Sequence, residues 1–212
     1  MRVKENIQTL NNITKKLMTN KRFKKIDHYY HLVEGWFNME QQYLELLDAT
    51  PEGGTFVELG CYKGKSTSFI GVEIHKQKRD INFFAVDSFQ GATNSNDANE
   101  VKAYEGISEI EEAYTYNVSL IGNKIKTIVS LTDEASQYFD DKSVDVLFVD
   151  AGHSREAVIK DIDCWLPKIK PNGIMAGHDY KAWEGVNQAV NEVFGTPHKV
   201  ENDCWFIYIN RL

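Results

Sequence analysis

The chain has few cysteines and no long apolar segment. Only three cysteines occur among its 212 residues, and Cys61, Cys164 and Cys204 are widely spaced. Such a set indicates neither a disulfide framework nor a Cys-x-x-Cys metal site, so we interpret all three as reduced packing residues. No apolar run approaches the roughly 20 residues that a membrane-spanning helix needs, and the first residues lack the apolar stretch of a signal peptide. These absences predict a cytoplasmic protein with no membrane partner.

Basic side chains are scarce outside the first 25 residues. That segment holds eight lysines and arginines and a single acid, whereas the rest of the chain holds 16 basic and 30 acidic residues. An acidic body argues against a nucleic-acid-binding groove. Apolar residues recur at helical spacing within the basic segment, so residues 1–28 are expected to form a helical extension. We interpret it as an added structural helix or a contact within a homo-oligomer, and the alternative is a contact with an anionic ligand or a membrane surface.

The rest of the chain alternates strand-like and helix-like apolar patterns. Strands are predicted at residues 55–59, 82–86, 125–129, 144–149 and 174–177, and helices near 30–48, 65–77, 100–121, 132–139, 154–167 and 184–194. This alternation predicts an α/β fold with a doubly wound, mostly parallel sheet. Residues 198–209 are typical of a β-hairpin with Asn202-Asp203 in its turn, which brings the sheet to seven strands and gives it an antiparallel edge.

Length and composition favour a single domain over residues 29–212. With 42% hydrophobic and 26% charged side chains, the chain can bury one sizeable core. The connection over residues 88–120 is too long for a plain crossover, so we expect it to form a lid or a wall of the substrate site.

Four predicted strands end in, or run into, an acidic residue: Glu58, Asp87, Asp150 and Asp179. The carboxyl ends of parallel strands meet at one edge of a sheet, and open α/β sheets bind their ligands in the crevice beyond that edge. The sequence therefore predicts an active site at this edge.

The turn after the first strand, residues 58–67, resembles two phosphate-binding patterns but matches neither. Gly64-Lys65-Ser66 looks like the end of a P-loop, but Leu59 stands where its first glycine belongs. In a dinucleotide-binding turn, Tyr62 would occupy the second glycine position, where backbone approaches a pyrophosphate. The Glu-x-Gly-x-x-x-Gly spacing instead predicts a turn that brings backbone close to a ligand without a diphosphate, with Ser66 placed to bind a carboxylate.

Three segments resemble class I S-adenosylmethionine-dependent methyltransferases. Residues 58–66 resemble the first motif of that class, especially the catechol O-methyltransferase-like branch, where a tyrosine also sits between the glycines. Residues 149–156 and 171–180 resemble the fourth and fifth motifs of a bacterial branch associated with sugar and natural-product O-methylation. The similarity covers about residues 34–195. It implies a Rossmann-like methyltransferase fold, S-adenosylmethionine as cofactor, and a small-molecule acceptor whose hydroxyl is methylated.

The expected cofactor contacts combine this resemblance with strand position. Asp87 ends the second strand, where an acid can accept hydrogen bonds from a ribose diol. Ser130 and Thr132 match family contacts on the adenine side, and Thr132 is also a candidate helix N-cap. The complete set of predicted cofactor-binding residues is Glu58, Gly60, Tyr62, Gly64, Ser66, Asp87, Ser130, Thr132 and Asp150.

Asp150 and Asp179 follow adjacent strands, so their carboxylates could converge on one divalent cation. The resemblance implies a metal here, and oxygen ligands suit magnesium, calcium or manganese, which would lower the pKa of a bound hydroxyl. Tyr180, a poor ligand, stands where metal-dependent relatives carry an amide or a second acid. Water or His178 is therefore expected to complete the shell, and the alternative is that Asp179 only orders its loop.

His153 is the predicted general base, with Asp150 as the other catalytic residue. It lies three residues after Asp150, where the catechol-type relatives carry a basic lysine, and imidazole with its pKa of about 6.5 can accept a hydroxyl proton at neutral pH. The alternative is that His153 caps the following helix. Two other functions stay open: a P-loop-like nucleotide-hydrolysing enzyme and a noncatalytic cofactor-binding module.

Overall fold

The computed structural model describes residues 27–91, 109–122 and 124–211. All but the last two residues of the predicted N-terminal extension, and residues 92–108 of the 88–120 connection, lie outside the described residues. Among the residues that are described, no helix is long and apolar enough to cross a membrane.

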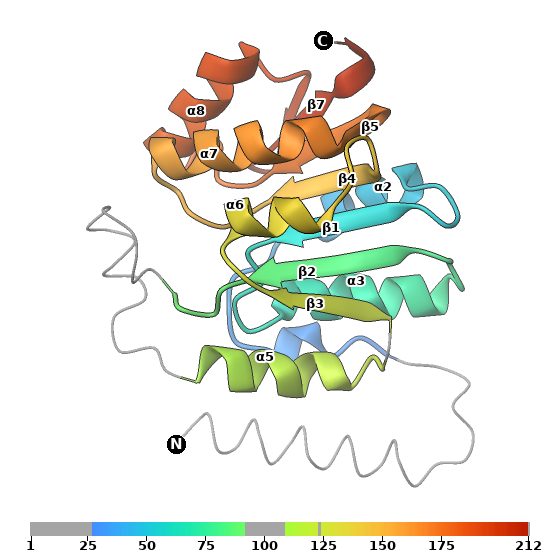
Figure 1. The fold of residues 1–212 in the computed structure, drawn as a ribbon. Helices are drawn as coiled ribbons and strands as arrows, with labels where there is room; N and C mark the ends of the chain where they lie inside the picture. Colours follow the sequence, from blue (N-terminus) through green and yellow to red (C-terminus); the bar gives the residue numbers. More distant parts are fainter. Residues whose placement is uncertain (1–26, 92–108, 123, 212) are drawn as a thin grey trace, which may run out of the picture.

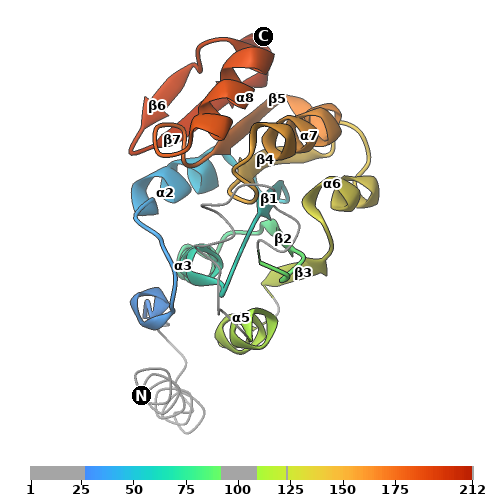
Figure 2. The same ribbon diagram turned by 90° about the vertical axis from the view of Figure 1, so that its left-hand side faces the viewer.

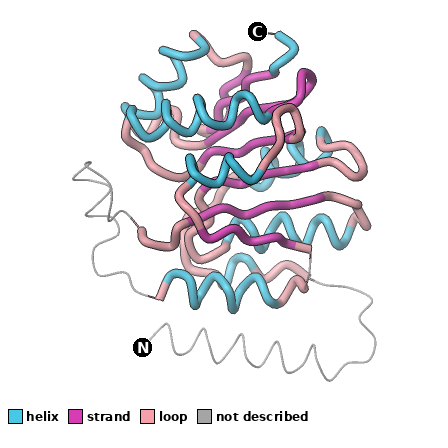
Figure 3. The backbone as a smooth tube through the Cα atoms, viewed as in Figure 1, coloured by secondary structure: helices cyan, strands magenta, loops and turns pink. Residues whose placement is uncertain are grey.

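In the part of the chain that the structure describes, seven strands build one sheet (Figures 1 and 3). They are β1 (Thr55–Leu59), β2 (Asn82–Asp87), β3 (Ile125–Val129), β4 (Val144–Val149), β5 (Ile169–Gly177), β6 (Lys199–Glu201) and β7 (Cys204–Tyr208). The α-helices are α2 (Glu40–Ala49), α3 (Lys65–Lys76), α5 (Ile110–Ser119), α6 (Thr132–Ala135), α7 (Arg155–Trp165) and α8 (Glu184–Phe194). Short 3-10 helices are η1 (Tyr30–Leu32), η2 (Ser136–Tyr138), η3 (Leu166–Lys168) and η4 (Ile209–Arg211).

The strand order is β3-β2-β1-β4-β5-β7-β6. The first five strands in this order are parallel, and β7 pairs antiparallel with both β5 and β6. This confirms the predicted doubly wound sheet with an antiparallel hairpin edge. The chain order reverses between β1 and β4, which is the switch point where open α/β sheets bind ligands.

Helices cover both faces of the sheet, with α2, α3 and α5 on one face and α6, α7 and α8 on the other (Figure 2). Successive strand residues point to opposite faces. Along β1, Phe56 therefore packs in the α2/α3/α5 layer and Val57 in the α6/α7/α8 layer. All six residues of β4 are buried because that strand lies at the centre of the sheet.

Two predicted helices are shorter than expected. The helix predicted near 30–48 is wrong in its first half, because only η1 forms there and α2 begins at Glu40. Gly35 in between has a φ of +130°, which a helix cannot accommodate. The helix predicted over 132–139 is α-helical only as far as Ala135.

The turn after β1 touches the end of β4 through backbone alone. Gly60 has a φ of +83°, and a Cβ built on it would lie 2.0 Å from the carbonyl oxygen of Asp150. The amide of Asp150 donates to the carbonyl of Leu59 at 2.8 Å. Only glycine fits this position, so the two loops that border the switch point are held against each other.

Gly60→Ala should destabilise the fold more than Gly53→Ala does. Gly53 also has a positive φ, +73°, but nothing lies within 4 Å of a Cβ there. Each alanine bears a backbone cost of about 1–2 kcal/mol, and overpacking at Gly60 adds about 1–3 kcal/mol. Urea unfolding of both variants measures the difference, and equal losses would contradict the steric argument.

A buried carboxylate holds α6 on α7. The Thr132 hydroxyl donates to Asp161 Oδ1 at 2.6 Å, and the Trp165 indole donates to the carbonyl of Thr132 at 2.8 Å. Asp161 is 2% exposed, and burial raises its pKa to about 7.

Asp161→Asn should flatten the pH dependence of stability. Because the folded pKa lies above the unfolded value, the contribution of Asp161 is present at low pH and is lost as the pH rises from about 4 to about 7. Over that range the unfolding free energy of the natural protein should fall by up to roughly 4 kcal/mol more than that of the variant. Urea titrations at several pH values test this, and parallel profiles would refute it.

Candidate functional site

One cleft opens at the carboxyl edge of the parallel strands. It is lined by Gly35–Met39 before α2 and by residues of the loops that follow β1, β2, β3, β4 and β5. Of the residues predicted to bind the cofactor, the cation or the acceptor, those that line the cleft are Gly60, Tyr62, Ser66, Asp87, Thr132, Asp150, His153, His178 and Asp179. The predicted strand-end site is therefore one continuous surface.

Asp87 organises the glycine turn. Its Oδ2 accepts hydrogen bonds from the backbone amides of Cys61 at 2.7 Å and Tyr62 at 2.9 Å, while Oδ1 accepts from the amide of Phe89 at 2.7 Å. A carboxylate has about four lone-pair sites, so capacity remains for a ligand. Asp87 thus couples the ends of β1 and β2 and still borders the cleft.

Glu58 does not reach the cleft, so the prediction that it contacts the cofactor is corrected. Its side chain is fully buried and accepts hydrogen bonds from the hydroxyls of Tyr43 at 2.7 Å and Thr67 at 2.6 Å. Burial also raises its pKa. The alternation along β1 turns this carboxylate toward α2 and α3, so its role is to tie those helices to the sheet.

Three other predicted residues act through backbone or local packing. Gly64 adopts a φ of +81° before α3 and packs against Tyr114 of α5. The amide of Ser130 donates to the carbonyl of Asp87 at 3.1 Å. Gly64 and Ser130 do not line the cleft, whereas Thr132 does. Thr132 is not the N-cap, because Leu131 occupies that position and the Thr132 hydroxyl is bound to Asp161.

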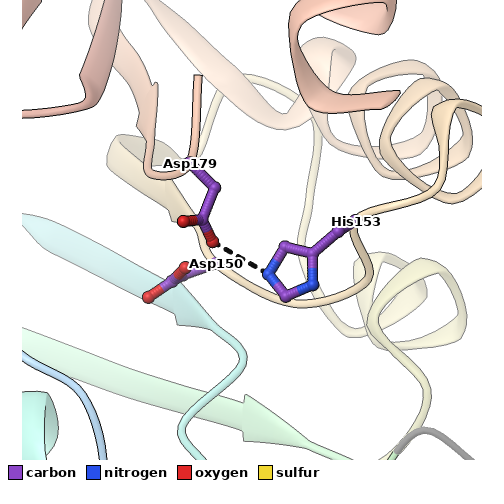
Figure 4. Close-up of side chains that lie close together, drawn as sticks. All are labelled: Asp150, His153 and Asp179. Carbon is purple, nitrogen blue, oxygen red and sulfur yellow. Dashed lines mark ion pairs between the residues drawn. The ribbon is translucent and has the colours of Figure 1, made fainter. Parts of the chain in front are cut away.

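Two aspartates and two histidines form an Asp–His cluster at the ends of β4 and β5: Asp150, His153, His178 and Asp179. Figure 4 shows His153 Nε2 directed at Asp179 Oδ2, 2.9 Å away. The other oxygen of Asp179, Oδ1, lies 3.2 Å from His178 Nδ1. The same nitrogen lies 3.8 Å from Asp150 Oδ1. Asp179 therefore uses one oxygen for each histidine.

The loop after β5 holds Asp179 and the His153 ring in place. Asp179 has a φ of +63°, and its carbonyl accepts a hydrogen bond from the amide of Trp183 at 3.0 Å. The indole of Trp183 stacks on the imidazole of His153, with ring centres 4.6 Å apart and planes 12° from parallel. The amide of Tyr180 donates to the carbonyl of Asp203 in the β6–β7 turn at 3.1 Å. The antiparallel hairpin thus supports the site.

The two carboxylates of the cluster have opposite pKa shifts. Removal from water raises the pKa of Asp150 to about 7, with His178 opposing the rise and Asp179 adding to it. For Asp179, burial also favours the neutral form, but hydrogen bonds from His153 and His178 hold its pKa well below the usual range. Asp179 is therefore the carboxylate of the cluster that stays ionised. Burial lowers the pKa of His178, but the two acids outweigh this and the net shift is upward.

The donor set fits a divalent cation. Ligand atoms of Asp150, His153 and Asp179 all lie within 4.8 Å of one another, and so do those of His178, Asp179 and Asp203. Carboxylate oxygens and imidazole nitrogens are both common metal donors.

Some cleft residues carried no sequence signal. Asp133, Lys160 and Asp161 line the end of the cleft beside α6 and α7, and Lys160 Nζ lies 2.7 Å from Asp133 Oδ2. They come together only because the two helices pack against each other. An aromatic residue before α2 is by contrast a recognisable signal, and Trp36, 68% exposed, lines the cleft with its ring centre 5.6 Å from that of Tyr62.

Comparisons with known proteins show the family to which the chain belongs. The model of a family described as a methyltransferase domain matches residues 57–180, from β1 through the whole Asp–His cluster. The uncharacterized protein y4gI of Sinorhizobium fredii (strain NBRC 101917 / NGR234) is 28% identical over 128 residues. That match spans 60% of this chain and only 13% of the relative.

Three solved structures share the fold. The O-methyltransferase NovP has a TM-score of 0.66 at 16% identity, over 80% of this chain and 78% of its own. The calicheamicin methyltransferase CalS11 has a TM-score of 0.63 at 14% identity, over 98% and 92%. SMU.1697c of Streptococcus mutans, solved in complex with SAH, has a TM-score of 0.55 at 9% identity, over 82% and 97%. Because the family match spans more than half of the chain, the protein belongs to this methyltransferase domain family and has the class I S-adenosylmethionine-dependent methyltransferase fold.

Proposed function

We propose that the protein transfers the methyl group of S-adenosylmethionine to a hydroxyl oxygen of a small molecule such as a sugar or natural product. The observation that carries the proposal is the position of the Asp–His cluster. It borders the same cleft as the Gly60 turn and Asp87, so a cofactor at the turn has proton-accepting groups beside it. NovP, described as an O-methyltransferase, shares the fold.

At the cofactor end of the cleft, both backbone groups of the Gly60 turn and the carboxylate of Asp87 are placed to bind the cofactor. In the proposal, Asp87 accepts hydrogen bonds from the ribose hydroxyls while it keeps the turn amides of Cys61 and Tyr62. The adenine lies toward Thr132, which borders the cleft after β3. The close approach of Gly60 to Asp150 directs the sulfonium toward the Asp–His cluster. Orientation of this kind can supply a large part of the rate enhancement of a bimolecular transfer.

At the end of the cleft beside the Asp–His cluster, His153 takes up the hydroxyl proton of the acceptor. The acceptor oxygen forms a bond to the methyl carbon as the carbon–sulfur bond breaks, which leaves S-adenosylhomocysteine, and the hydroxyl proton moves to His153 Nδ1, the ring nitrogen that does not face Asp179. Asp179 Oδ2, which is ionised and lies 2.9 Å from Nε2, accepts the Nε2 hydrogen and stabilises the imidazolium that forms. Trp183, stacked on the ring, keeps the nitrogen facing that carboxylate.

A divalent cation fits this end as well. Asp150 and Asp179 would hold it, and when bound it would act as a Lewis acid that lowers the pKa of the acceptor hydroxyl.

Asp87→Asn should weaken S-adenosylmethionine binding. The amide has a single acceptor oxygen, so it cannot serve three backbone amides and a ribose. A lost hydrogen bond to a charged group amounts to about 1.5–3 kcal/mol, which corresponds to roughly a ten- to hundredfold rise in Kd. Calorimetry measures this, with exposed Asp48→Asn as control. An unchanged Kd would remove Asp87 from the cofactor site.

His153→Ala should retain S-adenosylmethionine binding and lose methyl transfer by a factor on the order of 10²–10⁴, the usual contribution of a general base. Mass spectrometry of a hydroxylated-metabolite library incubated with labelled cofactor identifies the product whose rate is then compared. His75→Ala, an exposed histidine on α3, serves as the matched control. Unchanged turnover in His153→Ala would show that His153 is not the general base.

The two alternative functions predict different results from those expected of a methyltransferase. A noncatalytic module would bind the cofactor and yield no methylated product from any acceptor. A nucleotide-hydrolysing enzyme would be stabilised by ATP rather than by S-adenosylmethionine. In this chain the fully buried Leu59 stands where the first glycine of a P-loop belongs, which argues against that function.

A further inference from the structure

His178 places an imidazole nitrogen between the two carboxylates that would hold a cation. His178 Nδ1 lies 3.2 Å from Asp179 Oδ1 and 3.8 Å from Asp150 Oδ1. Two atoms bound to one ion at about 2.1 Å are about 3.0 Å apart when adjacent and about 4.2 Å apart when opposite. Both distances fall in this range, and ligand atoms of Asp150 and Asp179 lie within 4.8 Å of one another. His178 Nδ1 is therefore close enough to share an ion with either carboxylate.

Tyr180 does not occupy the ligand position beside Asp150 and Asp179, and His178 does. The Tyr180 hydroxyl donates to Asn191 Oδ1 on α8 at 3.0 Å, so it serves the packing of the β5 loop on that helix. Asp203 is also near, but its Oδ1 accepts the amide of Lys181. Among the described residues after β5, His178 is therefore the group that joins Asp179 beside Asp150.

Asp179 separates the two histidines. Its Oδ1 faces His178 and its Oδ2 faces His153, which keeps the His153 ring beside the seat formed by Asp150, His178 and Asp179. A carboxylate that binds a metal and orients a neighbouring imidazole is a familiar arrangement. His153 thus remains available to take the acceptor proton while the other three residues hold an ion.

The donor set determines which ion is favoured. Magnesium and calcium prefer oxygen ligands, and magnesium gives up its water reluctantly. Imidazole suits first-row transition ions, whose affinity for mixed nitrogen and oxygen sites rises from manganese onward. A neutral imidazole in place of a third carboxylate also lowers the negative charge that attracts hard cations. Resting on the proposed function, we propose that this seat binds a first-row transition ion, Mn²⁺ being our probe, in preference to Mg²⁺, through Asp150, Asp179 and His178.

Ion binding to the chelator-treated full-length chain tests this without reference to activity. Calorimetry with MnCl₂ and MgCl₂ should give a Kd for Mn²⁺ at least tenfold below that for Mg²⁺. Pulsed electron paramagnetic resonance of the Mn²⁺ complex should show coupling to an imidazole nitrogen, which changes when the chain is labelled with ¹⁵N-histidine. Three results with the natural protein would each overturn the proposal. They are Mg²⁺ binding that is as tight as Mn²⁺ binding or tighter, no Mn²⁺ binding, and no coupling to nitrogen.

Matched variants identify the histidine. His178→Asp should abolish the nitrogen coupling and bring the two ion affinities to within about threefold, whereas His153→Gln and His75→Gln should keep the coupling. Coupling that survives in His178→Asp, or disappears in His153→Gln, would overturn the assignment. S-adenosylmethionine binding, measured on the same samples, reports folding. It also separates the two proposals, because loss of cofactor binding with Mn²⁺ binding intact contradicts the proposed function alone.

Discussion

The backbone contact between the Gly60 turn and the end of β4 is the constraint on which the site depends. Ladder hydrogen bonds continue one residue past the strand ends, from Gly60 to Val86, from Asp150 to Leu59 and from His178 to Val149. Each loop therefore starts at a defined height on the sheet. Because Gly60 has no side chain, the turn can lie against the Asp150 carbonyl. The cofactor turn and the Asp–His cluster are thereby parts of one rigid edge, which is what a transfer between two bound molecules requires.

Within the Asp–His cluster, Asp179 is the residue on which the arrangement of the others depends. Its strained backbone, its two histidine partners and the support from the β6–β7 turn all fix one carboxylate between two imidazoles. The low pKa of Asp179 and the raised pKa of Asp150 mean that these neighbouring carboxylates lose their protons at different pH values. Such divergence is typical of functional sites, although structural networks also produce it. A proton acceptor and a cation seat can coexist here because each uses a different oxygen of Asp179.

The sequence predicted the sheet and most of the cleft for a physical reason. Acids at the ends of parallel strands must meet at one edge, and Asp87, Asp150 and Asp179 do. Glu58 fails this rule because both faces of β1 are covered, and spacing does not reveal which face an acid takes. Gly35 interrupts a helix that apolar periodicity extends through it. Asp133, Lys160 and Asp161 meet only through the packing of α6 on α7, which no local pattern encodes.

A crystal structure of the protein with S-adenosylmethionine tests the central claim most directly. The account predicts that the ribose hydroxyls lie on Asp87, that the turn from Gly60 contacts the cofactor through backbone, and that the sulfonium methyl faces His153 and Asp179. An empty cleft at saturating cofactor, or a cofactor bound elsewhere with its methyl directed away from the Asp–His cluster, would contradict it.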